Sequence, residues 1–268
     1  MIDWEARRRE LEAELGEPIT VDGLSASYKI FQRRHGHRHS TDDLMTAWYA
    51  LEHAPVVARA PEVGTDGERG RLLSRALDLG AGIGGVTLLV ESAGISVVAI
   101  EAQAISYRFL VENIRGNAAR VEALHGDLRE LSRADRFELV TGSPPYFDPS
   151  AGIVPADSQK AHARFELRGS ISDYARAAAV HLAPGGWFVL CFPYQQLERA
   201  IAALHREGFT IAYRRDVIPR VGLAPLFSVF ACRLEAGPEV IEPAFTVRDP
   251  DGTHTEELRA VRRRFGWP

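Results

Sequence analysis

The chemically most distinctive stretch of the chain is Ser143-Pro144-Pro145-Tyr146, which directly follows the largely apolar run 137–142. Each proline fixes its own φ, lacks an N–H group and restricts the residue before it to an extended conformation. The corner therefore offers carbonyl oxygens and the Ser143 hydroxyl without competing backbone donors. Ser143 and Pro144 could accept the N–H groups of an exocyclic amine and aim its lone pair at an electrophile, and Tyr146 could stack on a planar base. The alternative is a rigid turn with a surface tyrosine.

The glycine-rich stretch DLGAGIGG, residues 78–85, is a second element with chemical meaning. Gly80, Gly82 and Gly85 satisfy G-x-G-x-x-G, in which missing side chains let the backbone approach a ligand at a helix N-terminus. NAD-dependent dehydrogenases and methyltransferases both use this pattern. Asp78 precedes the first glycine by two positions, where it could face a cationic amino acid group, and the chain predicts an antiparallel end to the sheet. Both observations favour S-adenosylmethionine as the cofactor.

Two further acids follow predicted strands. Glu101 comes about 20 residues after the glycines, where a carboxylate can accept both ribose hydroxyls, and Asp127 is placed to accept from an adenine amino group. Glu101 could instead cap the next helix, and Asp127 could simply begin a turn. Because ligands of such sheets bind at the carboxyl ends of strands near the switch point, we expect these acids to join Asp78, Gly80 and Gly82 in one site.

Alternating strands and helices must position these residues. Strands are predicted at 75–80, 96–101, 121–125, 137–142 and 186–192, and helices at 84–93, 103–116, 171–182 and 194–207, the third capped by Ser170 with Asp173. The alternation is typical of βα units around a parallel sheet. Residues 209–220 and 225–235 should pair as an antiparallel hairpin at the sheet edge. We therefore predict an α/β fold, Rossmann-like, with a seven-stranded mixed sheet.

The flanking segments predict a cap and an extension within a single domain: an N-terminal cap 1–54, a core 72–235 and a C-terminal extension 236–268. The cap is expected to contain a helix at 1–15, a strand, Asp-Gly turn and strand at 19–32, and a helix at 42–53 capped by Thr41. Residues 55–71 have the composition of an exposed loop. The extension is expected to form a strand, an Asp-Pro-Asp-Gly turn and a helix capped by Thr253, with Glu256 three residues later.

Composition narrows the functional classes. The 268 residues are 46% hydrophobic, enough for a substantial core, and the net charge of −4 argues against a protein that coats nucleic acid non-specifically. Cys191 and Cys232 lie in apolar strand-like runs, which is typical of reduced buried thiols. The charged start of the chain has no apolar h-region, and no 18 apolar residues follow one another. We expect a cytoplasmic protein without a membrane span.

The order DLGAGIGG, AIEA, HGD and SPPYF resembles the class I S-adenosylmethionine-dependent methyltransferases that carry an (Asn/Asp/Ser)-Pro-Pro-(Tyr/Phe) motif and modify amino groups. The segments FQRRHGHRHSTDDLMTAWYA and DPDGTHTEELRAVRRRF make the chain similar to the bacterial adenine-N6 methyltransferases of valine tRNA. This resemblance implies in-line methyl transfer to adenine N6 of tRNA or another structured RNA. It also implies that Gln32, Thr41 and Asp42 lie over the cofactor. One departure is Ser143, which stands where that family has asparagine, so a different amine or a shifted pose stays open. Cytosine-N4 DNA methyltransferases also use Ser-Pro-Pro-Tyr.

The substrate side is expected to combine the proline corner with cations that face phosphates. The residues assigned to it are Pro145, Phe147, Arg34, His37, Arg38 and Arg164. The long segment 147–169 should shape the entrance, with Lys160, Arg164 and Arg168 as phosphate contacts or as partners in structural salt bridges. His35, His37 and His39 alternate but lack a matching cysteine or carboxylate set, so no metal is expected. Rival functions are a protein glutamine-N5 methyltransferase, a small-molecule N-methyltransferase and a non-catalytic cofactor-binding RNA module.

Overall fold

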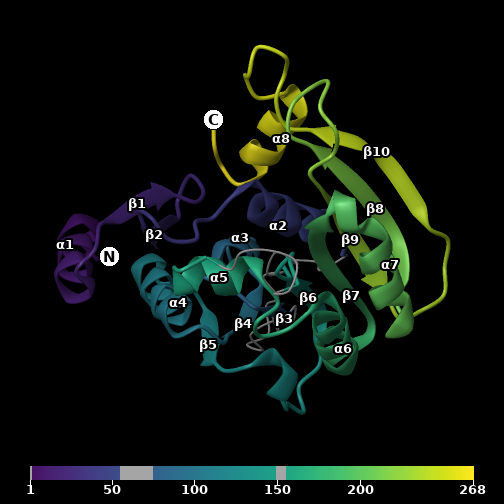
Figure 1. Ribbon diagram of the computed structural model, residues 1–268, viewed down its shortest axis with the longest axis horizontal. Coiled ribbons are helices and arrows are strands. Elements are labelled where there is room, and N and C mark those ends of the chain that lie inside the picture. Colours follow the sequence, from purple (N-terminus) through teal and green to yellow (C-terminus); the bar gives the residue numbers. More distant parts are fainter. Residues whose placement is uncertain (1, 55–74, 149–154) are drawn as a thin grey trace, which may run out of the picture.

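The architecture of the chain is seen in a computed structural model that describes residues 2–54, 75–148 and 155–268 (Figure 1). The predicted loop 55–71 lies outside the described residues, as do residues 149–154 of the expected entrance segment. An eight-stranded mixed sheet forms the centre, and a separate pair of antiparallel strands lies near the N-terminus. The α/β, Rossmann-like prediction is confirmed, but the central sheet has eight strands instead of seven.

The central sheet has the strand order β10-β8-β9-β7-β6-β3-β4-β5. Its strands are β3 (Arg75–Leu79), β4 (Ser96–Glu101), β5 (Val121–His125), β6 (Phe137–Gly142), β7 (Leu182–Pro193), β8 (Thr210–Ile218), β9 (Phe227–Arg233) and β10 (Val240–Thr246). The small sheet pairs β1 (Ile19–Gly23) with β2 (Lys29–Arg33). The helices are α1 (Trp4–Leu15), α2 (Thr41–His53), α3 (Gly85–Glu91), α4 (Ala104–Asn117), α5 (Ser158–Arg164), α6 (Ile171–His181), α7 (Leu197–Arg206) and α8 (Glu256–Arg264).

The eighth strand, β10, changes the predicted edge of the sheet. The strands β8 and β9 pair antiparallel as predicted, but β10 pairs in parallel with β8 on its outer side, so the hairpin does not form the edge. Pro243 lies within β10, and the pairing with β8 shifts register between Glu242 and Phe245. Proline has no N–H group to donate to a neighbouring strand, so it is tolerated in an edge strand or at a bulge. Pro243 lies in an edge strand and at a register shift.

Strand register brings the predicted site residues to one end of the sheet. The strand β3 lies between β6 and β4 and is parallel to both, with Leu79 opposite Gly142 on one side and Ile100 on the other. Therefore the glycine loop that follows β3, the proline corner that follows β6 and Glu101 at the end of β4 all leave the sheet side by side.

Two apolar layers enclose the sheet. One face packs against α2 and α3 and includes Met45, Leu88 and Cys191, whereas the other packs against α6 and α7 and includes Leu204 and Cys232. Both cysteines are fully buried and free, as predicted. Because successive side chains of a strand alternate between faces, the two thiols lie on opposite sides of the sheet.

The N-terminal hairpin is joined to the glycine loop through Asn113 of α4. Its side-chain oxygen accepts from the Phe31 N–H at 2.6 Å, and its amide donates to the carbonyls of Phe31 and Ile83 at 3.1 and 2.9 Å. The predicted Asp-Gly turn is wrong, because Asp22 and Gly23 still belong to β1 and pair with β2. The chain reverses over residues 24–28, where the Leu24 N–H donates to the Tyr28 carbonyl at 2.8 Å.

Two predicted helix caps are displaced by one or two residues. The N-cap of α2 is Ser40 instead of Thr41, and the Ser40 N–H donates to the Asp43 carboxylate at 3.0 Å. The N-cap of α8 is Thr255 instead of Thr253, and its hydroxyl accepts from the Leu258 N–H at 3.2 Å. The predicted capping box of Ser170 and Asp173 at α6 is present.

Candidate active site

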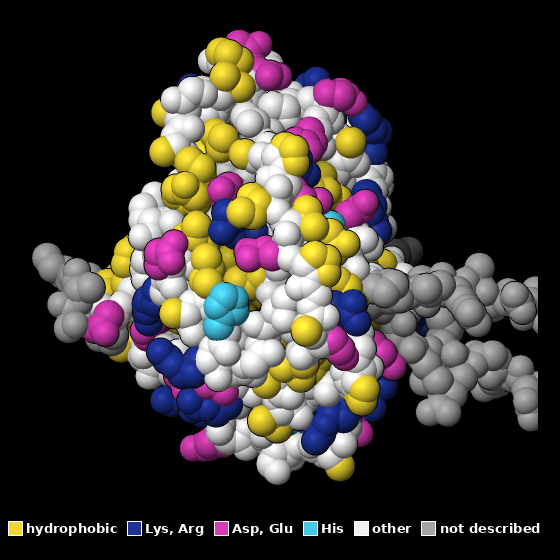
Figure 2. All heavy atoms as spheres, turned by 90° about the vertical axis from the view of Figure 1, so that its right-hand side faces the viewer, with side chains coloured by type: hydrophobic (Ala, Val, Ile, Leu, Met, Phe, Trp, Pro, Cys, Tyr) yellow, Lys and Arg dark blue, Asp and Glu magenta, His cyan; other side chains and the backbone are white. Residues whose placement is uncertain are grey.

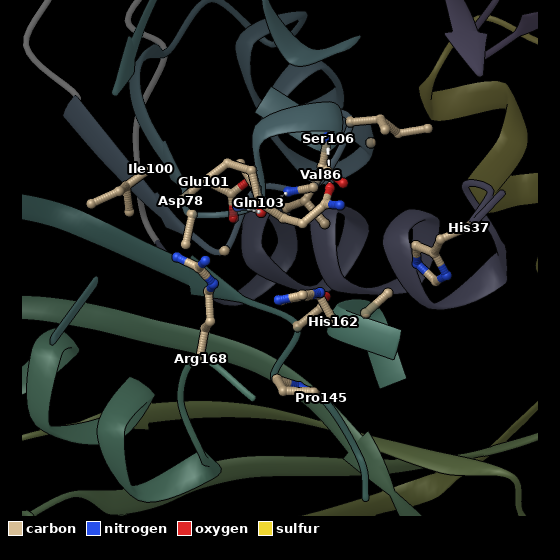
Figure 3. A pocket seen from close by; sticks show the side chains of 18 of the residues that line it. His37, Asp78, Val86, Ile100, Glu101, Gln103, Ser106, Pro145, His162 and Arg168 are labelled. Carbon is tan, nitrogen blue, oxygen red and sulfur yellow. Dashed lines mark hydrogen bonds between the residues drawn. The ribbon is translucent and has the colours of Figure 1, made fainter. Parts of the chain in front are cut away.

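A cavity opens at the carboxyl ends of β3, β4 and β6 (Figure 3). The residues selected from the sequence that line it include Asp78, Gly80, Gly82, Glu101, Ser143, Pro145, His37 and Arg38. The first six come from the three neighbouring strand ends, and the last two from the turn between β2 and α2. The cavity therefore joins the glycine loop and the proline corner in one space.

Backbone conformation and close contacts explain three glycines of the loop. Gly80 and Gly82 have φ of 64° and 58°, in the left-handed region that favours glycine. A Cβ on Gly80 would meet the Tyr174 hydroxyl at 1.9 Å, and one on Gly85 would meet the Asp43 carboxylate at 2.7 Å. A Cβ on Gly82 would meet nothing within 4 Å, so this residue faces open space in the cavity.

Asp78 is a buried carboxylate beneath the glycine loop. It is 2% exposed and accepts hydrogen bonds from the hydroxyls of Thr87 at 2.5 Å and Thr141 at 2.8 Å. Burial raises its pKa, and these two hydroxyl bonds oppose the rise only in part. A positive group in the cavity would stabilise the ionised form, since an opposite charge nearby favours ionisation.

Glu101 is fixed by two backbone donors. Its carboxylate accepts from the Gly82 N–H at 2.8 Å and from the Gln103 N–H at 2.7 Å, and burial raises its pKa. The cap of α4 is Gln103, whose side-chain oxygen accepts from the Ser106 N–H at 2.8 Å, so Glu101 is not needed there. Each carboxylate oxygen keeps a further lone pair for hydroxyl donors.

Asp127 does not line the cavity, although its neighbours Gly126 and Leu128 do. It caps a 3-10 turn, η1 (Leu128–Glu130), and forms an ion pair with Arg129 at 2.5 Å. The hydrogen bond from Arg129 lowers the pKa of Asp127. The observed contacts of Asp127 are thus those of a residue that begins a turn, the alternative considered from the sequence. Contact with an adenine amino group stays a prediction.

The three residues assigned by resemblance to the roof of the cofactor site do not line the cavity. Gln32 is fully buried, donates to Asp22 at 2.8 Å and accepts from the His39 N–H at 3.0 Å, so it supports the turn that carries His37 and Arg38. Thr41 is exposed at the start of α2. Asp42 accepts from the Tyr146 hydroxyl at 3.0 Å.

On α2, the residue that reaches the cavity is Asp43, and not its neighbours Thr41 and Asp42. It lines the cavity, and its pKa is raised well above the usual value by burial and by the charges of Asp42 and Asp78. The spacing of Ser40 and Asp43, which is that of a capping box, was the available signal for this acid.

The proline corner is held firmly at its tyrosine. Ser143 and Pro145 line the cavity, whereas Pro144 and Tyr146 do not. The Tyr146 N–H donates to the Arg164 carbonyl at 3.0 Å, and the Tyr146 carbonyl accepts from Gln196 at 2.6 Å. Together with its hydroxyl bond to Asp42, these contacts direct the tyrosine toward α2. Stacking on a base stays a prediction.

The remaining residues of the expected substrate side lie outside the cavity. Arg34 and Arg164 are exposed, and Phe147 is 45% exposed and packs against Phe165 with ring centroids 5.6 Å apart. Within the cavity, Arg38 is engaged by Asp22 at 3.1 Å. Of the three cations suggested for the entrance segment, Arg168 lines the cavity.

The helix α5 was not predicted from the sequence, and neither were the side chains that this helix places in the cavity. His162 points into the cavity between Pro145 and the acids of β3 and β4 (Figure 3). Gln159, also on α5, is buried, accepts from the His37 N–H at 3.1 Å and donates to Ser106 at 3.3 Å. Seven residues without a clear apolar period give little sequence signal for a helix.

In residues 2–54, 75–148 and 155–268, no three His, Cys, Asp or Glu side chains are grouped so as to hold a metal ion. Across the same described parts of the chain, none of the helices combines the length and the apolar character that a membrane span requires.

Known proteins resemble this chain in sequence and in fold. The methyltransferase small domain family matches residues 68–172. A release factor glutamine methyltransferase of Bordetella pertussis is 30% identical over 196 residues, 65% of this chain and 70% of that protein. A tRNA1(Val) (adenine(37)-N6)-methyltransferase of Actinobacillus pleuropneumoniae is 26% identical over 196 residues, 70% of this chain and 80% of that protein. The solved 16S rRNA N2 G1207 methyltransferase of T. thermophilus, in complex with AdoMet and guanosine, has a TM-score of 0.54 at 22% identity, covering 81% of this chain and 50% of that chain.

The cavity fits S-adenosylmethionine, the cofactor of this family. Gly82 leaves open space for a ligand next to the backbone, and the partly buried carboxylate of Asp43 and the buried one of Asp78 would gain from a cationic group. Glu101 presents a fixed carboxylate to hydroxyl donors. With its fold, its cavity and its relatives taken together, the chain belongs to the class I S-adenosylmethionine-dependent methyltransferases.

Proposed function

We propose that this methyltransferase modifies an exocyclic amine, and that its substrate is adenine N6 in tRNA or another structured RNA. The observation that carries the proposal is the shared cavity: Ser143 and Pro145 line the same space as Gly82 and Glu101, because β6 lies directly beside β3. An amine held at the corner would then lie next to a ligand held at the glycine loop.

The role proposed for the proline corner is to bind the amine and to direct its lone pair. Bound S-adenosylmethionine supplies a methyl group on a positively charged sulfur. The Ser143 hydroxyl, which lines the cavity, accepts an N–H group of the amine, which helps to localise the nitrogen lone pair and to fix its direction. An acceptor role of the Pro144 carbonyl stays a prediction, because Pro144 does not line the cavity. Asp43, Asp78, Gly80, Gly82 and Glu101 hold the cofactor side, and Gln32 and Asp42 act through the residues that they support.

The choice of RNA rests on charge around the cavity and on relatives. Arg34 and Arg164 are exposed, and among the described residues neither has a carboxylate partner. In contrast, Arg33 is engaged by Glu17 at 2.7 Å and by Asp157 at 2.8 Å. Free guanidinium groups beside a cavity suit phosphates. The A. pleuropneumoniae relative, whose name gives tRNA adenine N6 as its target, supports the same substrate class.

A second candidate is methylation of a glutamine side-chain amide in a protein. The B. pertussis relative, named for that reaction on a release factor, is 30% identical and supports it. A carboxamide also presents two N–H groups, and Ser143 could accept from it as from adenine. The two candidates differ in what surrounds the amine, a phosphate backbone or a polypeptide.

Transfer of a labelled methyl group separates the candidates. Purified protein is incubated with labelled cofactor and, in parallel, with total tRNA, ribosomal RNA, DNA and a release-factor peptide. Label in tRNA or ribosomal RNA, located on N6-methyladenine after nuclease digestion, is the expected result. Label in the peptide alone contradicts the RNA proposal, and tight cofactor binding without label in any acceptor supports a binding module.

A further inference from the structure

Four polar side chains form a connected chain behind the proline corner. The Tyr146 hydroxyl donates to the Asp42 carboxylate at 3.0 Å and lies 3.9 Å from the Cys191 sulfur. The Cys191 thiol in turn contacts the Ser143 hydroxyl oxygen at 3.5 Å. These residues come from α2, from the corner and from β7, so the contacts join three segments that are far apart in the sequence.

The geometry gives a direction to the contact between Cys191 and Ser143, with the thiol as the donor. Burial, with a further contribution from the charge of Asp42, raises the pKa of Cys191 to about 12. The sulfur therefore carries its proton at neutral pH, so the proton that this donor role requires is present. On the other side, a carboxylate can only accept, so the Tyr146 hydroxyl donates its proton to Asp42.

This arrangement leaves Ser143 with a defined orientation. A serine hydroxyl rotates among three staggered positions, and its proton can turn to either side, whereas a carboxamide side chain such as that of asparagine is planar. A thiol that occupies one lone pair of the Ser143 oxygen leaves the other lone pair and the hydroxyl proton for the cavity, which Ser143 lines. The contact thus restricts the freedom that comes with the shorter side chain.

We propose that Cys191 is a positioning residue that holds the Ser143 hydroxyl in the orientation in which it accepts from the substrate amine. This inference rests on the proposed function, because it assigns Cys191 a part in binding that amine. Cys191 itself is fully buried and does not line the cavity, so it acts only through Ser143.

The second cysteine of the chain is a matched control. Cys232 is equally buried, but it packs on the opposite face of the sheet, and no hydrogen bond of its side chain is found among the described residues. Cys232→Ala therefore removes the same atoms from an equivalent apolar environment without touching the corner. Both cysteine-to-alanine changes are expected to cost similar stability, since each leaves a small cavity.

Infrared spectroscopy tests the contact without cofactor or substrate. Because the chain has two cysteines, the Cys232→Ala variant contains one thiol, and its S–H stretching band reports on Cys191 alone. Adding Ser143→Ala should shift that band toward the frequency of a more weakly hydrogen-bonded thiol, since the contact that remains is the longer one to the Tyr146 hydroxyl at 3.9 Å. An unchanged band would show that Cys191 does not donate to Ser143 and would overturn the proposal.

Kinetics on whichever amine accepts the labelled methyl group test the consequence. Cys191→Ala should lower kcat by about tenfold, the effect of one lost hydrogen bond, and leave cofactor affinity within about twofold. Cys191→Ser, which keeps a donor, should restore most of kcat, and Cys232→Ala should leave it unchanged. Equal losses in the two alanine variants, or no restoration by serine, would refute the positioning role. If no acceptor is labelled, the proposed function fails, and the infrared band still decides whether the contact exists.

Discussion

Ser143 and Asp78 line the same cavity but serve different partners. Ser143 belongs to the acceptor corner after β6, and Asp78 is buried under the glycine loop, where two threonine hydroxyls hold it. A hydroxyl that is required only for the reacting amine contributes to turnover, whereas a buried acid beside a cationic ligand contributes to affinity. The two residues can therefore be separated by measuring both quantities.

Ser143→Ala should lower kcat by about 10- to 100-fold, since one oriented acceptor is lost, and should leave the calorimetric affinity for cofactor almost unchanged. Asp78→Ala should have the opposite pattern, with weaker cofactor binding as its main effect. Loss of cofactor affinity in Ser143→Ala would contradict the division of roles. Circular dichroism spectra and melting temperatures of both variants provide the control for folding.

Cofactor affinity should rise with pH because of Asp43 and Asp78. Burial raises both pKa values above the usual 3.8, so the neutral forms stabilise the free protein at low pH, and this stability is lost as the pH rises through the raised values. A cationic ligand favours the ionised forms, so binding must release protons within this window. Calorimetry in two buffers of different ionisation enthalpy counts the protons released.

An Asp43→Asn variant is the control for this pH dependence. It should release fewer protons than the natural protein and show a flatter dependence of affinity on pH, since one of the cavity acids with a raised pKa is gone while Asp78 and Glu101 remain. Proton uptake on binding, or identical release in the two proteins, would be inconsistent with a cationic group near these acids.

At the scale of elements, α5 closes one side of the cavity through Gln159. The buried amide of this residue contacts the His37 N–H and the Ser106 hydroxyl, and Asp157 at the helix N-terminus pairs with Arg33. The helix is thereby connected both to the N-terminal cap and to α4. Its position, and that of His162 in the cavity, depends on these few polar contacts.

Gln159→Ala should loosen α5 and speed cofactor release by about three- to tenfold, because buried polar groups on two neighbouring elements lose their partner. Stopped-flow displacement measures that rate, and hydrogen exchange of residues 158–164 should increase in parallel. Gln195→Ala is the matched control, since Gln195 is exposed and lies on a different element. Equal release rates in the two variants would argue against a restraining role for Gln159.

The sequence could predict elements whose limits are set by local periodicity. The strand β6 has the predicted bounds 137–142, and the six site residues at the ends of β3, β4 and β6 meet because parallel strands end at one edge. A strand was expected in the C-terminal extension, but its place as β10 in the central sheet was not predicted, because Pro243 interrupts the apolar pattern. Asp43 and His162 could not be placed in the cavity, since the docking of α2 and α5 depends on tertiary contacts. Ser40 and Thr255 displaced the predicted caps because neighbouring hydroxyls compete for the same role.

At the scale of the whole molecule, the positive side chains that could contact a polyanion such as RNA are unevenly distributed. The net charge is −4, and the face that carries β8, β10 and α7 mixes basic, acidic and apolar side chains (Figure 2). Near the cavity, Arg34 and Arg164 are exposed guanidinium groups. Binding of RNA should therefore depend on a few local phosphate contacts rather than on a broad positive field.

Arg34→Ala and Arg164→Ala should each weaken RNA binding and reduce the slope of log affinity against log salt by about one, the effect of losing one phosphate contact. Filter binding or fluorescence anisotropy over a range of salt concentrations measures the slope. Arg263→Ala is the control, because Arg263 pairs with Glu256 on α8 at 2.6 Å. Slopes equal to that of the control would remove these arginines from the RNA surface.

The contacts of β10 and α8 with α2 bear on the order in which the enzyme is made. The Tyr49 hydroxyl donates to Glu242 at 2.7 Å across 193 residues of sequence, and Arg264 pairs with Glu52. The helix α2 carries both Asp42 and Asp43, yet it gains these partners only when the later strand and helix have left the ribosome. The methyl-transfer site is thus completed at a late stage of synthesis, and a nascent chain that lacks residues 240–264 holds its acids on a helix without its final supports.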